Sequence, residues 1–418
     1  MAEKVVLINA SELVTCSGQA AKCGATMSEI GVINDGAIAM EGGIITHVGK
    51  TEDVVNAIQI DEYEVYDVSG KTVMPGFVDP HTHLVFGGYR QDEYSWRLAG
   101  QTYVEIMEKG GGINNSVQHT SAASFQELFD AAYGRLDSML SFGVTTVEGK
   151  SGYGLYLDTE LKQLKVYKAL QREHPLDIAV TYLGPHSLPA EYKGRATEFI
   201  DYQIEKCLPA VKSLEIAEFA DIFCEKNVFD VQQSRTFLTA AKNMGFKLKI
   251  HADEIVSLGG AELAAEVGAV SADHLLQASD QGIADMVEKG VVATLLPITA
   301  FSLKEHYARA RDMIDRGAAV ALATDLNPGS CFSESTPLLI ALATLQMQMT
   351  AEETITALTI NAAAAIDRAD RIGSLDVGKQ ADVVIHEFPS YKYLPYHIAV
   401  STVETVFKKG EIVYQRSF

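Results

Sequence analysis

The segment Pro75-Gly76-Phe77-Val78-Asp79-Pro80-His81-Thr82-His83 ends an apolar run with two histidines that are separated by a single residue. Residues i and i+2 of a strand project from the same face, so His81 and His83 can direct both imidazoles at one point. Imidazole nitrogen is a ligand for zinc, iron and related metals. Taken alone, the pair is equally well explained by one core histidine and one exposed histidine. The rest of the chain decides between these interpretations.

The composition is that of a globular protein. The chain has 418 residues, of which 47% are hydrophobic and 21% are charged, so it has room for two domains. Its formal net charge of -21 disfavours nucleic acid and anionic membranes as partners, because both would be repelled. An anionic substrate would therefore need a local cluster of cationic and polar groups.

The cysteines and the N-terminus indicate the compartment. Five cysteines are scattered along the chain without a Cys-x-x-Cys pair, which indicates neither a disulfide framework nor a thiolate zinc site. The N-terminal apolar run is too short for a signal peptide, and no later stretch is long enough to span a membrane. We therefore expect a cytoplasmic protein with no membrane partner, and a homodimer remains open.

Both ends of the chain consist of short strand-like runs separated by turns, and Gly42-Gly43 between two such runs is a hairpin signal. Residues 1–71 plus 377–418 are predicted to form one small β-sandwich domain. Residues 72–376 differ, because short apolar β-branched runs alternate there with segments of helical spacing, as in Leu161, Leu164, Tyr167 and Leu170.

This alternation predicts an α/β fold with eight parallel strands, which is the number that closes a (β/α)8 TIM-like barrel. An open doubly wound sheet is less favoured, because no Gly-x-Gly-x-x-Gly opens a helix after the first strand. The predicted strands are 72–79, 144–148, 178–183, 220–224, 247–251, 270–273, 291–295 and 319–324.

One long insertion, residues 87–124, follows the first predicted strand and contains Gly110-Gly111-Gly112. The triple glycine lacks the Lys-Ser/Thr that completes a phosphate-binding P-loop. Loops of this length are usually functional, so we interpret the insertion as a flap over an active site.

Metal-competent side chains recur where the predicted strands end. His81 and His83 end the first strand, His251 ends the fifth, His274 follows the sixth and Asp325 follows the eighth. Active sites of these barrels lie at the C-terminal ends of the strands. We therefore predict one divalent ion, zinc or iron, that is bound by His81, His83, His251 and Asp325.

Catalytic roles follow from the same positions. A metal-activated hydroxide would hydrolyse the substrate, and Glu254, three residues after His251, suits a general acid/base that does not bind the metal. His274 is predicted to stabilise an oxyanion or to hold the nucleophile, and Asp325 to act in catalysis as well as in metal binding. The alternative for Glu254 is a solvated carboxylate in the first turn of a helix.

Several of these segments carry a resemblance. PGFVDPHTH after a small β domain, HADE, and TDLNPGS at the eighth strand resemble the amidohydrolase superfamily of metal-dependent hydrolases. Within it, FGGYR, EGKSGYGL, TYLGPH and DLNPGSC are similar to the imidazolonepropionase family. The resemblance covers nearly the whole chain. It implies opening of the ring of a small anionic imidazolone, 4-imidazolone-5-propanoate, to N-formimino-L-glutamate in histidine degradation.

The resemblance also implies substrate-binding residues. Arg90 in FGGYR, Tyr153 in SGYG and His186 in LGPH match residues that hold the substrate. A propanoate needs such cationic or hydroxyl donors, although without the resemblance a surface ion pair and a packed aromatic would be the better interpretations of Arg90 and Tyr153. Further matches line the same pocket, namely Asn327, Gly329 and Ser330.

Three alternatives stay open. Some superfamily members bridge two metals with a carboxylated lysine, but neither Lys150 nor Lys226 lies in a matching segment, so one metal is favoured. A deaminase of a nucleobase-like heterocycle could use the same metal site, although Arg90 and His186 favour an anionic substrate. A non-catalytic scaffold is disfavoured because the predicted ligands and Glu254 are all present.

Overall fold

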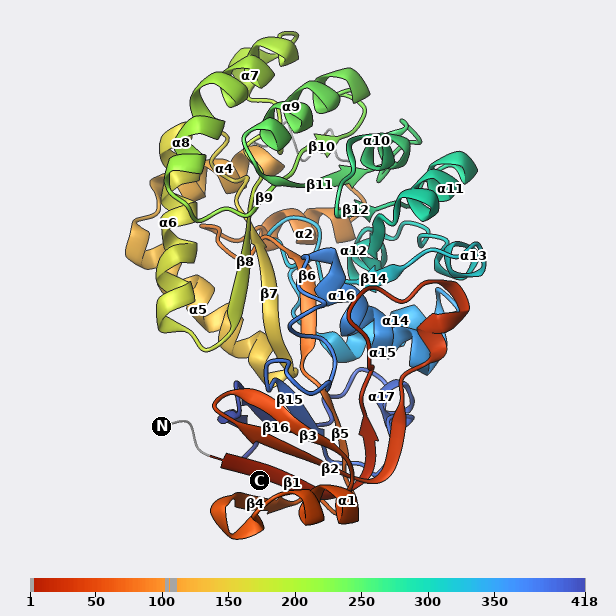
Figure 1. The fold of residues 1–418 in the computed structure, drawn as a ribbon. Helices are drawn as coiled ribbons and strands as arrows, with labels where there is room; N and C mark the ends of the chain where they lie inside the picture. Colours follow the sequence, from red (N-terminus) through yellow and green to blue (C-terminus); the bar gives the residue numbers. More distant parts are fainter. Residues whose placement is uncertain (1–3, 102–104, 106–110, 418) are drawn as a thin grey trace.

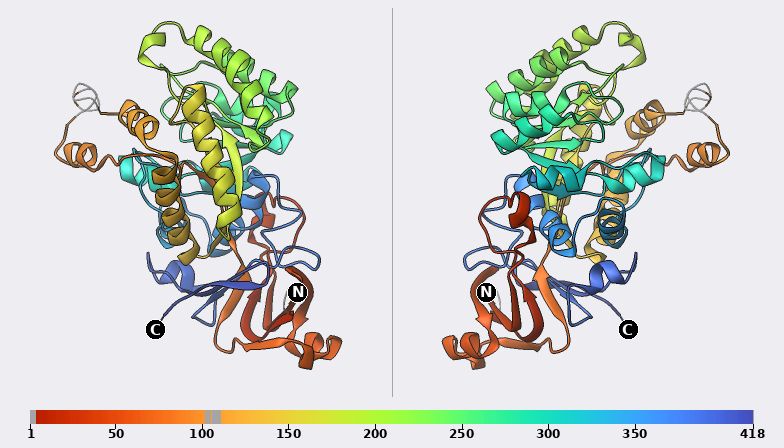
Figure 2. Two further views of the ribbon diagram at one scale, coloured as in Figure 1. Left: turned by 90° about the vertical axis from the view of Figure 1, so that its left-hand side faces the viewer. Right: turned by 90° about the vertical axis from the view of Figure 1, so that its right-hand side faces the viewer.

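The computed structural model describes residues 4–101, 105 and 111–417. The chain forms a parallel barrel and, below it in Figure 1, a smaller sheet to which both ends of the chain contribute. Figure 2 shows helices around the outside of the barrel and places the N-terminal and C-terminal strands side by side in the small domain. The prediction of a TIM-like barrel with a small β domain built from both termini is therefore confirmed.

The barrel strands follow one another in chain order, and each described pair is parallel. The barrel closes where the amide of His83 donates to the carbonyl of Leu326 across 2.8 Å. The strands are β6 (Phe77–Thr82), β7 (Val144–Lys150), β8 (Asp177–Tyr182), β9 (Phe219–Ala220) with β10 (Phe223–Cys224), β11 (Lys247–Ala252), β12 (Ser271–His274), β13 (Val292–Leu295) and β14 (Val320–Leu322).

Two predicted strands differ from the structure. The strand predicted at 220–224 is interrupted between β9 and β10. The single strand predicted at 72–79 is wrong, because the chain leaves β5 (Thr72–Pro75) at Gly76 and enters β6 in the other sheet. A Cβ at Gly76 would lie 2.3 Å from Thr145 Oγ1, so only glycine allows this close crossing. The domain boundaries at 71/72 and 376/377 stay a prediction.

The small domain is one continuous mixed sheet in the order β17-β16-β15-β5-β1-β2-β3, with β4 beside β1. Val5 and Leu7 of β1 enter its apolar core with Phe407, whereas Val6 faces the opposite side and contacts the cluster around Val54. This alternation is that of a strand buried on both faces. The strands are β1 (Lys4–Val14), β2 (Val32–Glu41), β3 (Ile44–Lys50), β4 (Glu64–Asp67), β15 (Val383–His386), β16 (Val403–Lys408) and β17 (Glu411–Gln415).

The helices between the barrel strands bury one face each. The helix predicted from Leu161, Leu164, Tyr167 and Leu170 is present as α6, which buries Leu164, Tyr167 and Leu170. The helices are α1 (Thr51–Ala57), α2 (Gln91–Leu98), α4 (Ile113–Ala122), α5 (Phe125–Ser141), α6 (Leu157–Glu173), α7 (Ala196–Tyr202), α8 (Leu208–Ser213), α9 (Val231–Asn243), α10 (Gly260–Val267), α11 (Asp280–Lys289), α12 (Pro297–Leu303), α13 (Ala310–Asp315), α14 (Thr336–Leu345), α15 (Ala351–Leu358), α16 (Ile360–Ala365) and α17 (Tyr393–Tyr396).

The insertion after β6 contains α2 and α4. Residues 102–104 and 106–110 of the predicted flap, and with them Gly110 of the triple glycine, lie outside the described residues. Among the helices of the described ranges, none combines the length and the apolar character that a membrane crossing requires.

Candidate active site

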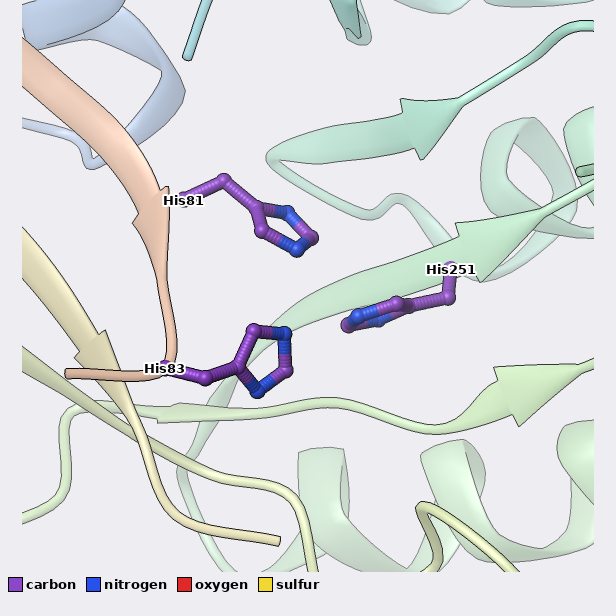
Figure 3. Close-up of side chains that lie close together, drawn as sticks. All are labelled: His81, His83 and His251. Carbon is purple, nitrogen blue, oxygen red and sulfur yellow. The ribbon is translucent and has the colours of Figure 1, made fainter. Parts of the chain in front are cut away.

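Five predicted site residues meet at the C-terminal end of the barrel. His81 lies in β6, His83 directly follows it, and His251 and His274 lie at the ends of β11 and β12. Figure 3 shows the rings of His81, His83 and His251 turned toward a common point. Donor atoms of these three rings lie within 4.8 Å of one another, and a second such group joins His81, His274 and Asp325. Strands far apart in the sequence thus place five potential ligands in one location.

The imidazoles are buried, and several of their nitrogen atoms lack a partner. Among the residues that the structure describes, Nε2 of His81 and both ring nitrogens of His251 are buried without a hydrogen-bond partner. Nδ1 of His81 lies 2.6 Å from Asp273 Oδ2, so the carboxylate holds the proton on Nδ1 and leaves the Nε2 lone pair free. Burial lowers the pKa of His81 and His83 well below the usual value, so both are neutral. Neutral imidazoles with free lone pairs fit a divalent metal.

Asp325 adds an oxygen donor to the same point. Its Oδ1 lies 3.5 Å from His81 Nε2 and 3.6 Å from His83 Nε2. Its Oδ2 accepts a hydrogen bond from the Thr299 hydroxyl at 2.7 Å. Burial raises the pKa of Asp325 to about 6, and the hydroxyl works against this rise. The backbone of Asp325 has φ 54°, a left-handed conformation that costs energy and is common where a side chain is aimed at a site.

Glu254 and His274 line the same pocket and lie close to each other. Oε1 of Glu254 lies 3.6 Å from Nδ1 of His274, which is buried and has no hydrogen-bond partner in the described part of the chain. Burial, assisted by the negative charge of Asp325, raises the pKa of Glu254 to about 8. A carboxyl group with such a pKa can exchange a proton near neutral pH. His274 has φ 77°, a second strained backbone at the site.

The structure brings His186 and Tyr153 against the metal-binding cluster. The His186 ring stacks on that of His83, with centroids 4.9 Å apart and planes at 12°. Nδ1 of His186 lies 3.1 Å from the carbonyl of Gly152 and donates to it, which leaves Nε2 as an acceptor. Burial and the nearby His251 lower the pKa of His186 to about 3, so the ring is neutral. The Tyr153 ring lies 5.8 Å from that of His83.

Arg90 lies at the rim of the same pocket and is held in place by Glu93. Its Nε and Nη2 donate to Glu93 Oε2 across 2.9 and 2.7 Å. The Glu93 carboxylate also accepts from the amide of Gly112 and from Asn115. Nη1 of Arg90 lies over Gly329, where a Cβ would be only 2.2 Å away. Glycine at position 329 therefore makes room for the guanidinium.

The loop after Asp325 is organised by Asn327. The Asn327 side-chain carbonyl accepts from the amides of Gly329 and Ser330, and its amide donates to the carbonyl of Asp325 at 2.7 Å. In these hydrogen bonds, the Asn327 side chain contacts only the backbone of its own loop. Asn327 therefore shapes the pocket wall, which it lines together with Gly329 and Ser330.

These groups surround one pocket with a volume of about 590 Å³. It is large enough for a small heterocyclic acid with its water. The predicted residues that line it are His83, Arg90, Tyr153, His186, His251, Glu254, His274, Asp325, Asn327, Gly329 and Ser330.

Sequence reasoning missed the polar residues that support the site. Asp273 contacts His81, and Asp221 Oδ2 lies 3.0 Å from His251 Nδ1. Thr299 and Glu93 hold Asp325 and Arg90 as described above. A signal for these supporting residues exists in the sequence, because Lys150 and Asp273 are charged residues within segments predicted to be buried barrel strands. No local pattern tells which partner each of them has.

The comparisons with known proteins agree with this geometry. A model of the amidohydrolase family matches residues 72–413. The chain is 57% identical to an imidazolonepropionase of Clostridium tetani over 99% of both chains. It is 56% identical to an imidazolonepropionase of Parabacteroides distasonis over 98% of both chains.

Solved structures share the fold at low sequence identity. A triazine hydrolase from Arthobacter aurescens superposes with a TM-score of 0.74 at 15% identity, and the match covers 99% of this chain and 95% of that one. An adenosine deaminase from Xanthomonas campestris with bound zinc gives a TM-score of 0.66 at 20% identity, with 98% and 92% covered. The fold and the close relatives together lead to one assignment. The chain belongs to the amidohydrolase family and, within it, to the imidazolonepropionases.

Proposed function

We propose that the protein is a metal-dependent cyclic amide hydrolase that opens 4-imidazolone-5-propanoate to N-formimino-L-glutamate in histidine degradation. The observation that carries the proposal is the set of buried imidazole nitrogens without partners, beside Asp325, in a pocket with Arg90 at its rim. A cluster of neutral metal ligands next to one cationic side chain suits hydrolysis of a small anionic substrate.

His81, His83, His251 and Asp325 would hold a divalent ion, which would supply Lewis acidity for activating a water and polarising the amide carbonyl. Glu254 is placed to take the proton from that water and to return it to the ring nitrogen that leaves. Its raised pKa, about 8, supports both the uptake of the proton and its later release. His274, 3.6 Å from Glu254, is the proposed partner that stabilises the developing negative charge or orients the nucleophile.

The substrate-binding roles are proposed from the pocket geometry. Nη1 of Arg90, which is not used by Glu93, is proposed to bind the propanoate together with the Tyr153 hydroxyl. His186 does not act as a cationic donor, because its ring is neutral and its Nε2 accepts hydrogen bonds. We therefore assign its Nε2 to an N–H of the imidazolone ring, and Gly329 and Ser330 to the wall beside it.

One metal per chain is proposed in preference to two. The Lys150 ammonium contacts the carboxylates of Glu148 and Asp221 at 2.9 and 2.8 Å, so it is engaged as a cation. Against the effect of burial, these carboxylates raise the pKa of Lys150, which opposes carboxylation. Lys226 is exposed and lies outside the pocket lining. Zinc and iron are both compatible with three imidazoles and one carboxylate.

The decisive experiment supplies the purified protein with zinc or iron and follows 4-imidazolone-5-propanoate by NMR. Loss of the ring signals with formation of N-formimino-L-glutamate is expected. Ammonia release from cytosine or guanine, without consumption of the imidazolone, would support the rival deaminase. A protein that holds no metal after loading and consumes neither compound would support the non-catalytic scaffold.

The remaining expectations concern the surroundings of the protein. The cysteines of the described ranges are free, four buried and Cys23 exposed, which supports the proposed cytoplasmic location. The charge of -21 supports the expectation that nucleic acid is not a partner. A homodimer stays a prediction that sedimentation measurements can test.

A further inference from the structure

A cluster of buried charges lies in the barrel directly beneath the histidines. Lys150 is at its centre with no solvent exposure. Its Nζ donates to Glu148 Oε1 at 2.9 Å and to Asp221 Oδ2 at 2.8 Å, and it lies 3.5 Å from Asp273 Oδ2. A second buried lysine, Lys249, lies 3.6 Å from Asp273 Oδ2. The cluster thus contains two cations and three carboxylates, and none of these groups takes part in the proposed chemistry.

The carboxylate oxygens near Lys150 are the same atoms that face the metal-binding histidines. Asp273 Oδ2 is 2.6 Å from His81 Nδ1, and Asp221 Oδ2 is 3.0 Å from His251 Nδ1. Asp221 also accepts from the backbone amide of His251 through Oδ1 at 3.2 Å. One ammonium group therefore connects two carboxylates that hold different histidines. Asp273 accepts from the ring of His81, whereas Asp221 accepts from the backbone amide of His251 and lies beside its ring.

Lys249 differs from Lys150 in its partners. Its Nζ donates to Ser271 Oγ at 2.7 Å and to the carbonyls of Pro80 and Ala365, both at 3.2 Å. Most of its contacts are thus with neutral groups of the barrel wall, and it does not approach Asp221 in any described contact. Within the described ranges, Lys150 is the lysine that contacts both Asp273 and Asp221.

We propose that Lys150 is a positioning residue that couples His81 to His251 through Asp273 and Asp221, and thereby sets how tightly the site binds its metal. The proposal rests on the metal-binding role of these histidines given above. The ammonium holds both carboxylates in fixed rotamers, and these in turn hold the ring of His81 and the backbone of His251, so that both imidazoles stay turned toward the metal-binding point. Groups that hold metal ligands from behind typically change metal affinity 10- to 100-fold when they are removed.

The test compares zinc affinity in K150M and K408M by chelator competition, without substrate. Lys408 is a suitable buried control lysine, because its Nζ contacts Asp177 and Asp382 at 2.8 Å each, where the small domain meets the base of the barrel. K150M is expected to weaken zinc binding by about 10- to 100-fold. K408M is expected to change it by less than about twofold, although both variants lower thermal stability. Equal zinc affinity in K150M and the unmodified protein would overturn the proposal.

A double-mutant cycle tests the coupling even if K150M folds poorly. D221N and D273N retain side-chain size, and each should weaken zinc binding alone. Because Lys150 links them, their combined effect should depart from the product of the single effects by more than about threefold, as contacting residues usually do. Effects that multiply would overturn the coupling. An unmodified protein that binds no zinc would contradict the proposed function and this inference together, whereas normal zinc binding with multiplicative effects contradicts only the inference.

Discussion

The molecule contains two polar clusters that differ in whether their polar atoms have partners. At the base of the barrel, Lys408 contacts Asp177 and Asp382 at 2.8 Å each. Gln380 donates to the same two carboxylates, also at 2.8 Å. At the mouth, His81 and the other imidazoles keep buried nitrogens without partners.

Whether the polar atoms are paired distinguishes a cluster that stabilises the fold from a cluster that serves function. A buried polar group without a partner costs free energy, so its retention needs a reason outside folding. The basal cluster joins β8 to β15 and β16 and leaves each charge paired, which fits a structural role. The unpaired imidazole nitrogens at the mouth of the barrel fit a site that binds a metal ion from solution. Four predictions test this distinction, in order of their expected effect on activity.

His81→Ala should have the largest effect. Removing one ligand should lower kcat/KM by more than about a thousandfold, because even one oxyanion-hole donor contributes roughly 10²–10³-fold. Zinc content, measured by atomic absorption, should fall in parallel. The control is His386→Ala, since His386 is equally buried but bonds to Thr402 in the small domain. A His386→Ala protein that lost its zinc would break the comparison between the two clusters.

Glu254→Gln should lower kcat by about 10²–10⁴-fold while zinc stays bound, because the side chain moves protons but is not a ligand. The base form of Glu254 is needed, so kcat/KM should rise as pH increases through its pKa. That pKa is raised to about 8 in the absence of a cation, and a bound metal lowers it, so the rise should lie below pH 8. The rise should vanish in the variant. An unchanged pH profile would remove Glu254 from the mechanism.

Arg90→Met should raise KM for the propanoate substrate about 10- to 100-fold, the usual worth of a charge-assisted hydrogen bond. The value of kcat should change much less, since the carboxylate is remote from the reacting bond. Arg235→Met provides a control, because Arg235 forms an exposed ion pair with Glu266 on the outer helices. Equal KM values for the substrate and its uncharged amide in the unmodified protein would exclude the carboxylate contact.

Lys408→Met should leave kcat/KM unchanged at 25 °C but lower the free energy of unfolding by about 3–5 kcal/mol, since two carboxylates lose their buried cation. Against the effect of burial, Lys408 lowers the pKa of Asp177. The contribution of this ion pair to stability is therefore present above the pKa of the unfolded carboxyl, near 4, and is lost as pH falls below it. Urea denaturation at pH 7 measures the change in the free energy of unfolding, and its repetition at pH 3 measures how that change depends on pH. A variant with impaired catalysis would show that the basal cluster also supports the site.

The sequence predicted the barrel well because its signals are local. The β-branched runs and helical periods each arise within one segment, and α6 lies where Leu164, Tyr167 and Leu170 place it. The error at 72–79 has a physical cause. The run is apolar between Thr72 and Asp79, and the close approach of Thr145 to Gly76 in the structure shows that the chain changes sheets there. That contact joins residues far apart in the chain.

The sequence by itself determined which residue types stand at the ends of the strands, because parallel strands of a barrel must deliver their C-terminal residues to one rim. It therefore predicted that His81, His83, His251 and Asp325 meet. Only the tertiary structure decided how each is held, since Asp273, Asp221 and Lys150 find their partners across different strands. Ring orientation, the proton on Nδ1 and the pKa of Glu254 depend on burial and neighbours in space, and these arise only when the barrel closes.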